Sequence, residues 1–286
     1  MPHFKIILAY DGTPYHGWQI QPGLSTVQGA LAEALRRITH EIVLPQGSGR
    51  TDTGVHALAQ VASVTLAAPI PADRLHRALN HALPNSIRAI SVENAPPSFH
   101  ARHSAVSKIY EYRIFPLRLP FESQPVDGES DFDTAGELFE TTAAICPPTL
   151  APFVWPCPWP LSLDALNAAA SNVLGTHDFT TFAAAPSTEE NAPATYVRTI
   201  THSHWFHKDG LIYYRVAANG FLHHMVRNLV GTFVQCGARR RAPSSIPDIL
   251  QARNRARSGP TAPASGLFLV SVDYPPFDPR SISPPD

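Results

Sequence analysis

The stretch HFKIILAY, residues 3–10, decides the fold, because its length and apolar content predict a strand that opens a repeated series of elements. Working outward, the sequence predicts a helix, two strands, a second helix and a further strand, at residues 26–39, 41–45, 59–67, 71–83 and 86–93. The first part of the chain therefore has the order βαββαβ.

The rest of the chain repeats this order with one extra helix. The predicted elements are a strand at 107–115, a helix at 162–174, strands at 196–206 and 211–219, helices at 221–236 and near 246–255, and a strand at 267–274. Such a series makes an antiparallel sheet with helices on one face, and two sheets can join side by side. We expect an α+β fold of two similar βαββαβ (ferredoxin-like or RRM-like) halves. They would form a continuous, mostly antiparallel sheet with helices on one face and a central catalytic cleft.

This order divides the chain into two domains. Residues 1–106 form the N-terminal half, and residues 107–274 form the C-terminal half. A proline-rich insertion at about 116–160 is expected to lie outside the core, because so much proline cannot sit in a sheet interior. The tail, residues 275–286, is expected to be irregular.

The composition is that of a soluble protein. The chain has 286 residues, of which 44% are hydrophobic and 16% charged, and no run approaches the roughly 18 apolar residues of a membrane span. The N-terminus does not resemble a signal peptide, and the three cysteines are far apart, so we expect a cytoplasmic protein without disulfides. The net charge of -1 is low for a nucleic-acid-binding protein, although local arginine clusters allow a basic face.

The stretch GSGRTDTGVHAL, residues 47–58, carries the first candidate for chemistry. It is neither a Walker A loop nor a dinucleotide fingerprint, because no Gly-Lys-Ser/Thr follows and Asp52 stands where a glycine is required. A tight turn is the simple alternative. Arg50, however, puts a side chain that can meet a phosphate next to Asp52, a carboxylate that can attack or abstract a proton.

Two further segments complete a candidate site. Strand alternation places Tyr110 and Tyr112 on one face, where a tyrosine can stack on a base and its hydroxyl can move a proton; alternatively, both are core residues. Arg227 lies at the edge of an apolar helical stripe, so it either pairs with a carboxylate such as Asp52 or extends to water. Pairing would keep Asp52 ionised, as a nucleophile or base requires.

The fourteen histidines do not indicate a metal site. His223 and His224 are adjacent and would point apart on a helix, and His202 and His204 lie on a strand without a nearby carboxylate. We expect no metal and no cofactor.

Several motifs in order resemble the TruA family of tRNA pseudouridine synthases. They are YDGTPYHGWQIQPGLSTVQGAL, GSGRTDTGVHALAQVA, FHARHSAVSKIYEYRI, GTHDFTTF, VRTI, NGFLHHMVRNLVG and TAPASGLFLVSVDY, which together span about residues 4–274. The resemblance implies two similar α+β halves around a catalytic cleft and a homodimer that binds tRNA. It also implies isomerisation of uridine to pseudouridine at positions 38, 39 and 40 of the anticodon stem-loop, without cofactor or metal.

The resemblance also assigns roles to residues. Asp52 matches the catalytic aspartate, Tyr110 the tyrosine that stacks on the uracil, and Arg227 the basic partner of the aspartate. Arg50 resembles the arginine that helps to hold the flipped nucleotide. Apolar walls that include Leu267 would retain the detached uracil.

Two substitutions depart from the family pattern. Thr53 stands where alanine is usual and adds a hydroxyl near the carboxylate, and Lys108 replaces an arginine.

Two other functions remain open from the sequence. A noncatalytic RNA-binding protein on the same fold would keep Tyr110 and the arginines but would not need Asp52. A glycosidase or nuclease would need a second carboxylate paired with Asp52, and the motifs contain none.

Overall fold

The computed structural model describes residues 1–118, 144–185 and 193–276, and its main feature is one large sheet. The strands are β1 (His3–Tyr10), β2 (Gln46–Gly47), β3 (His56–Thr65), β4 (Ile87–Asn94), β5 (Ser107–Pro116), β6 (Trp155–Cys157), β7 (Gly175–Asp178), β8 (Val197–Lys208), β9 (Leu211–Ala218) and β10 (Leu267–Asp273). The helices are α1 (Val27–Thr39), α2 (Ala72–Ala82), α3 (Leu163–Ser171), α4 (Met225–Gly237) and α5 (Ile246–Gln251). The predicted α+β class with a mostly antiparallel sheet is confirmed.

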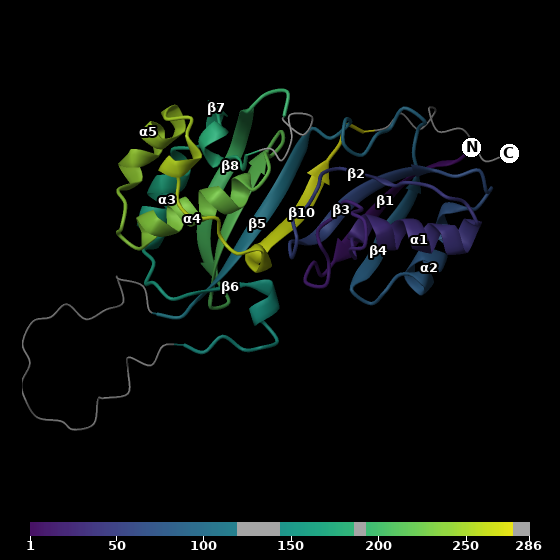
Figure 1. Ribbon diagram of the computed structural model, residues 1–286, viewed down its shortest axis with the longest axis horizontal. Coiled ribbons are helices and arrows are strands. Elements are labelled where there is room, and N and C mark those ends of the chain that lie inside the picture. The colour runs from purple at the N-terminus through teal and green to yellow at the C-terminus, as the bar shows by residue number, and fades with distance from the viewer. Residues whose placement is uncertain (119–143, 186–192, 277–286) are drawn as a thin grey trace, which may run out of the picture.

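The strand order shows how distant parts of the chain meet. It runs β4-β1-β3-β10-β5-β9-β8-β7, with β2 beside β3 and β6 beside β5. The pairs β3–β10 and β5–β6 are parallel, and the other pairs are antiparallel. In Figure 1, α1 and α2 lie at the end of the sheet that carries β1 and β4, and α3, α4 and α5 lie at the opposite end. The β3–β10 contact therefore joins the first strands of the chain to the last.

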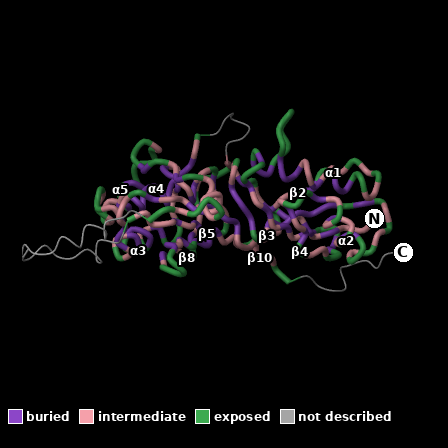
Figure 2. The backbone as a smooth tube through the Cα atoms, turned by 90° about the horizontal axis from the view of Figure 1, so that it is seen from below, coloured by how far each residue is buried: buried purple, intermediate pink, exposed green. Residues whose placement is uncertain are grey.

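The core lies between the strands and the helices. Alternate residues of β1 are buried while their neighbours are partly exposed, so one face of the strand packs inward. At the other end of the sheet, Trp205 of β8 stacks on Tyr214 of β9 with ring centroids 4.8 Å apart, and Phe233 of α4 meets Tyr214 edge-on at 5.5 Å. Full burial of one such side chain contributes roughly 1.5–3 kcal/mol. Figure 2 shows the buried segments running through the middle of the molecule.

Two parts of the predicted organisation are wrong. Residues 41–45 form no strand, because Pro45 has no N–H for a ladder and the Glu41 carboxylate instead accepts the N–H groups of Ala67 and Ala68, at 2.8 and 2.9 Å. The segment at 116–160 does not lie wholly outside the core. Residues 155–157 form β6 at the side of β5, where proline is tolerated, and Cys157 is fully buried.

Other predicted segments fall partly outside the described residues. These are most of a short helix that the sequence also predicts near 132–145, most of a loop that it predicts at 185–195, and nearly all of the tail at 275–286. Within the described part of the chain, no helix is long and apolar enough to cross a membrane.

Candidate active site

Asp52 lies in the loop between β2 and β3. Two hydrogen bonds fix this loop. The backbone N–H of Trp18 donates to the Thr51 carbonyl oxygen at 3.0 Å, and the hydroxyls of Thr51 and Tyr10 are 2.8 Å apart. Gly17 has a φ of +83°, and a Cβ on it would lie 2.5 Å from the Thr51 carbonyl oxygen. Only glycine fits there, so Gly17 fixes the course of the loop that presents Asp52.

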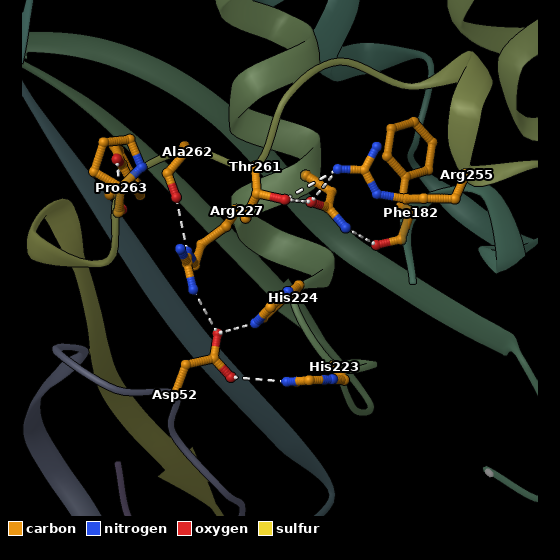
Figure 3. A network of polar contacts seen from close by, with 11 residues as sticks. Asp52, Phe182, His223, His224, Arg227, Arg255, Thr261, Ala262 and Pro263 are labelled. Carbon is orange, nitrogen blue, oxygen red and sulfur yellow. Dashed lines mark hydrogen bonds and ion pairs between the residues drawn. The ribbon is translucent and has the colours of Figure 1, made fainter. Parts of the chain in front are cut away.

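Arg227, in the first turn of α4, contacts Asp52 (Figure 3). Its Nη1 donates to Asp52 Oδ2 at 3.0 Å, and its Nε donates to the Ala262 carbonyl oxygen at 2.7 Å. The two side chains are 15% and 18% exposed. The structure thus brings together the arginine and the aspartate that the sequence pairs, and the alternative that Arg227 extends to water is wrong.

A buried polar network supports Arg227 from behind. At Gly231, α4 packs directly against the neighbouring loop. A Cβ at this position would lie 1.7 Å from the Pro260 carbonyl oxygen, so the close approach requires glycine. The fully buried Asn228 accepts hydrogen bonds from Arg255 at 3.0 Å and from Thr261 at 2.7 Å. This network orients the 259–263 loop, and so places the carbonyl oxygen that holds the guanidinium. This network is not evident from the sequence, because an arginine in a cluster carries no local sign of a buried partner.

His223 and His224 also reach Asp52, contrary to the prediction that they point apart on a helix. The helix begins only at Met225, and His224 precedes it in the left-handed conformation, with φ of +59°. Both rings therefore turn to the same side, with centroids 4.0 Å apart (Figure 3). His223 Nε2 lies 3.6 Å from Asp52 Oδ1, and His224 Nε2 lies 3.4 Å from Oδ2. Burial lowers the pKa of His224, and the charge of Asp52 opposes this shift.

Tyr110 lies on β5, close enough to Asp52 for the carboxylate charge to act on its hydroxyl. Burial raises the pKa of that hydroxyl well above the ordinary value, and the negative charge of Asp52 raises it further. Its ring meets Phe221 edge-on with centroids 5.1 Å apart, and only 8% of the residue is exposed. Tyr112 is fully buried and donates to the Pro263 carbonyl oxygen at 2.8 Å. Tyr112 is therefore a core residue, whereas Tyr110 is the tyrosine near the carboxylate.

Lys108 also supports the site, through a contact that the sequence did not reveal. Its Nζ donates to the Ser48 carbonyl oxygen at 2.6 Å and so ties β5 to the loop that carries Asp52. Burial lowers the pKa of Lys108 to about 8. Because β5 also carries Tyr110, this bond links the supports of the two candidate residues.

The remaining predicted residues lie around this centre. Arg50 is exposed two residues before Asp52. Leu267 is 5% exposed at the start of β10, opposite Tyr112 in the β5 ladder. Thr53 is exposed, and in the described part of the chain its hydroxyl makes no hydrogen bond to the Asp52 carboxylate.

Several of the clustered arginines pair with carboxylates, so they are less available to a polyanion than the sequence suggests. Arg36 and Arg37 both pair with Glu33, at 2.7 and 2.8 Å, and Arg253 pairs with Asp178 at 3.1 Å. These pairs neutralise part of the local positive charge.

The site has the groups for carboxylate chemistry. Asp52 offers an oxygen to a reactant while Arg227 holds the other oxygen, and Tyr110 adds a ring and a hydroxyl. Within the described residues, Asp52, His223 and His224 also form a group whose ligand atoms all lie within 4.8 Å of one another. The arrangement therefore suits a nucleophilic or basic aspartate, and it includes a potential cation site that the sequence analysis rejected.

Comparison with known families agrees with these motifs. A family model described as tRNA pseudouridine synthase matches residues 6–104 and 169–275, which include Asp52 and Arg227. The match omits the segment in which the insertion was predicted.

Curated relatives match over almost their full length. The tRNA pseudouridine synthase A of Solibacter usitatus is 42% identical over 275 residues, which are 96% of this chain and 100% of the relative. The protein of the same name from Moorella thermoacetica is 41% identical over 276 residues, with coverage of 96% and 100%. That of Methylobacterium radiotolerans is 38% identical over 281 residues, with coverage of 96% and 99%.

Proposed function

Because this chain belongs to the tRNA pseudouridine synthase family, we propose that it converts uridine to pseudouridine at positions 38, 39 and 40 of the tRNA anticodon stem-loop, with Asp52 as the reacting carboxylate. It is an isomerase that acts on tRNA. The observation that carries the assignment of Asp52 is its 3.0 Å ion pair with Arg227, made between residues 175 positions apart in the sequence.

The reaction explains why such a carboxylate is needed. The uracil must be detached from C1′, turned and rejoined through C5, so the nucleotide has to leave its stack and enter the protein. The Asp52 carboxylate either attacks C1′ or removes the 2′ proton to give a glycal. Arg227 keeps the carboxylate oriented in both cases, since it is fixed at its other end by the Ala262 carbonyl oxygen.

Tyr110 has two proposed roles in this reaction. Its ring is a platform on which the uracil stacks, and its hydroxyl relays the proton that leaves C5. A tyrosine hydroxyl is ordinarily protonated at neutral pH, and the raised pKa of Tyr110 favours that form further, so the hydroxyl acts as a hydrogen-bond donor and not as a phenolate. Only 8% of Tyr110 is exposed, so its covering, which includes Phe221, must shift when a base binds.

Other neighbours would hold the RNA and the detached base. Arg50, exposed beside Asp52, would contact the backbone of the flipped nucleotide, and Leu267 would form part of an apolar wall. No cofactor or metal is assigned a role in the reaction.

We also propose that the chain consists of two similar halves, residues 1–106 and 107–274, on either side of a catalytic cleft. The strand order supports this: β4-β1-β3-β2 in the first half corresponds position by position to β10-β5-β9-β8 in the second. We further propose a cytoplasmic homodimer that binds one tRNA across both subunits.

The function is tested with purified protein and an unmodified tRNA transcript. Pseudouridines are mapped by carbodiimide treatment, which leaves adducts that stop reverse transcription. We expect stops at uridines 38, 39 and 40, and none in a control transcript with cytidine at these positions. Modification confined to other arms of the tRNA would contradict the proposed substrate, and an unmodified transcript would contradict the function.

A further inference from the structure

The geometry around Asp52 points to a second property: we propose that Asp52, His223 and His224 bind a divalent transition-metal ion of the Zn²⁺ class, and that the bound ion blocks the reaction. Binding follows from the structure alone, whereas the block rests on the function proposed above. Two histidines and one carboxylate are the protein ligands of zinc in many proteins. Asp52, His223 and His224 supply this set.

The distances suit a small tetrahedral ion. With metal–ligand bonds of about 2.0–2.1 Å, two ligand atoms of a tetrahedral site lie roughly 3.3 Å apart. His223 Nε2 lies 3.6 Å from Asp52 Oδ1 and His224 Nε2 lies 3.4 Å from Oδ2, so the His224 ring must turn toward Oδ1 to share one ion with His223. One ligand atom from each of the three residues already lies within 4.8 Å of the other two. His223 is 60% exposed, so its ring can turn to close the remaining gap.

The backbone presents the two imidazoles as a pair. Adjacent residues of a regular helix would point about 100° apart, but His224 adopts φ of +59° just before α4, and both Nε2 atoms face the carboxylate (Figure 3). A left-handed conformation is uncommon for a residue other than glycine. The local fold therefore supplies a two-histidine arrangement that the sequence alone does not predict.

Two features of the site limit its affinity for a metal ion, and its ligand types set the selectivity. Arg227 occupies Asp52 Oδ2 and repels a cation, so the metal takes Oδ1. Within the described residues, neither Nδ1 atom has a hydrogen-bond partner, so no outer shell fixes the rings as in high-affinity sites. We expect micromolar binding of Zn²⁺ or Co²⁺. Mg²⁺ should not compete, because it prefers oxygen ligands in octahedral geometry.

Occupation of the site removes the reacting group. A metal on Oδ1 takes the oxygen that Arg227 leaves open, so the carboxylate can neither attack C1′ nor accept a proton. Zn²⁺ should therefore inhibit the enzyme at concentrations near its dissociation constant, and a chelator should restore activity.

Binding is measured first, without RNA, by calorimetric titration of the full chain with Zn²⁺ and by the visible absorption of Co²⁺. His223→Asn and His224→Asn should each weaken binding at least about tenfold. Asparagine tolerates the backbone conformation of His224, so this variant should still fold. His103→Asn is the matched control, because the rings of His100 and His103 are 4.3 Å apart but belong to no three-residue ligand group among the described residues.

The outcomes distinguish a failure of the proposed Zn²⁺ binding from a failure of the proposed tRNA modification. One micromolar Zn²⁺ site per chain that is weakened in both variants and kept in His103→Asn supports the proposal, whether or not the protein modifies tRNA. Equal binding by wild type and both variants, or no binding below millimolar Zn²⁺, overturns it. If Zn²⁺ binds as expected but pseudouridine formation proceeds undiminished at saturation, the inhibitory part is wrong.

Discussion

A double-mutant cycle on Asp52 and Arg227 measures the contact on which the site depends. Arg227 Nη1 lies 3.0 Å from Asp52 Oδ2, and two unit charges about 4 Å apart attract each other by roughly 4 kcal/mol at an effective dielectric constant of about 20. The side chains are 18% and 15% exposed, and the two histidines share the carboxylate, so the effective coupling is smaller. We expect a coupling free energy of about 1.5–3 kcal/mol between Asp52→Asn and Arg227→Met.

The assay is urea unfolding of the wild type, the two single variants and the double variant at pH 8, where imidazoles are ordinarily neutral. Asp73 and Arg77 provide a matched control, because they form a 2.9 Å pair one helical turn apart but are 71% and 73% exposed. Their coupling should be at most about 0.5 kcal/mol. A coupling at Asp52 and Arg227 no larger than that of the control pair would refute the reasoning that burial makes this ion pair strong.

Three further predictions follow from single contacts. Gly231→Ala places a Cβ 1.7 Å from the facing carbonyl oxygen, so it should destabilise the fold by roughly 1–3 kcal/mol and displace Arg227. In Gly237→Ala the Cβ meets only leucine side chains, the nearest at 2.8 Å, so this variant should cost less stability. Thermal unfolding and the activity of both variants check this prediction. Burial lowers the pKa of His56, so the unfolded chain takes up the proton first as pH falls below about 6.5, and stability is lost there. The destabilisation caused by His56→Asn should therefore shrink between pH 8 and pH 5, and a difference in melting temperature that does not change would contradict the shift. Tyr110→Phe keeps the ring but removes the hydroxyl, so tRNA binding should stay within about threefold while the single-turnover rate falls by about 100-fold or more; an unchanged rate would exclude the proton relay.

Local patterns predicted most of the regular elements. The strand predicted at 3–10 is observed as β1, and the helix predicted at 71–83 is observed as α2 at Ala72–Ala82. Residues 41–45 were predicted wrongly because the apolar side chains there include Ile42, which is 93% exposed and forms no strand. Apolar residues alone do not reveal whether a neighbouring strand is available to pair with them.

The site was predicted in part for a similar reason. Asp52 and Arg227 are recognisable from residue type and motif, and their pairing needed only the expectation that a partly buried arginine has a partner. The two histidines were misjudged because their placement depends on one left-handed residue at the start of α4, and a shift of four residues in the helix boundary reverses where the rings point. The hydrogen bond of Lys108 to Ser48 joins positions 60 residues apart, which no local pattern reveals.

The most direct test of the central claim compares wild type with Asp52→Asn on tRNA labelled with tritium at C5 of uridine. Asparagine keeps the size of the side chain and the hydrogen bond from Arg227 but removes the charge that attacks or accepts a proton. Single-turnover release of tritium, with enzyme in excess, reports the chemistry, and filter binding reports the affinity for tRNA. We predict that the affinity stays within about threefold while the rate falls by at least about 1,000-fold. Tritium release at the wild-type rate would contradict the claim that the Asp52 carboxylate performs the reaction.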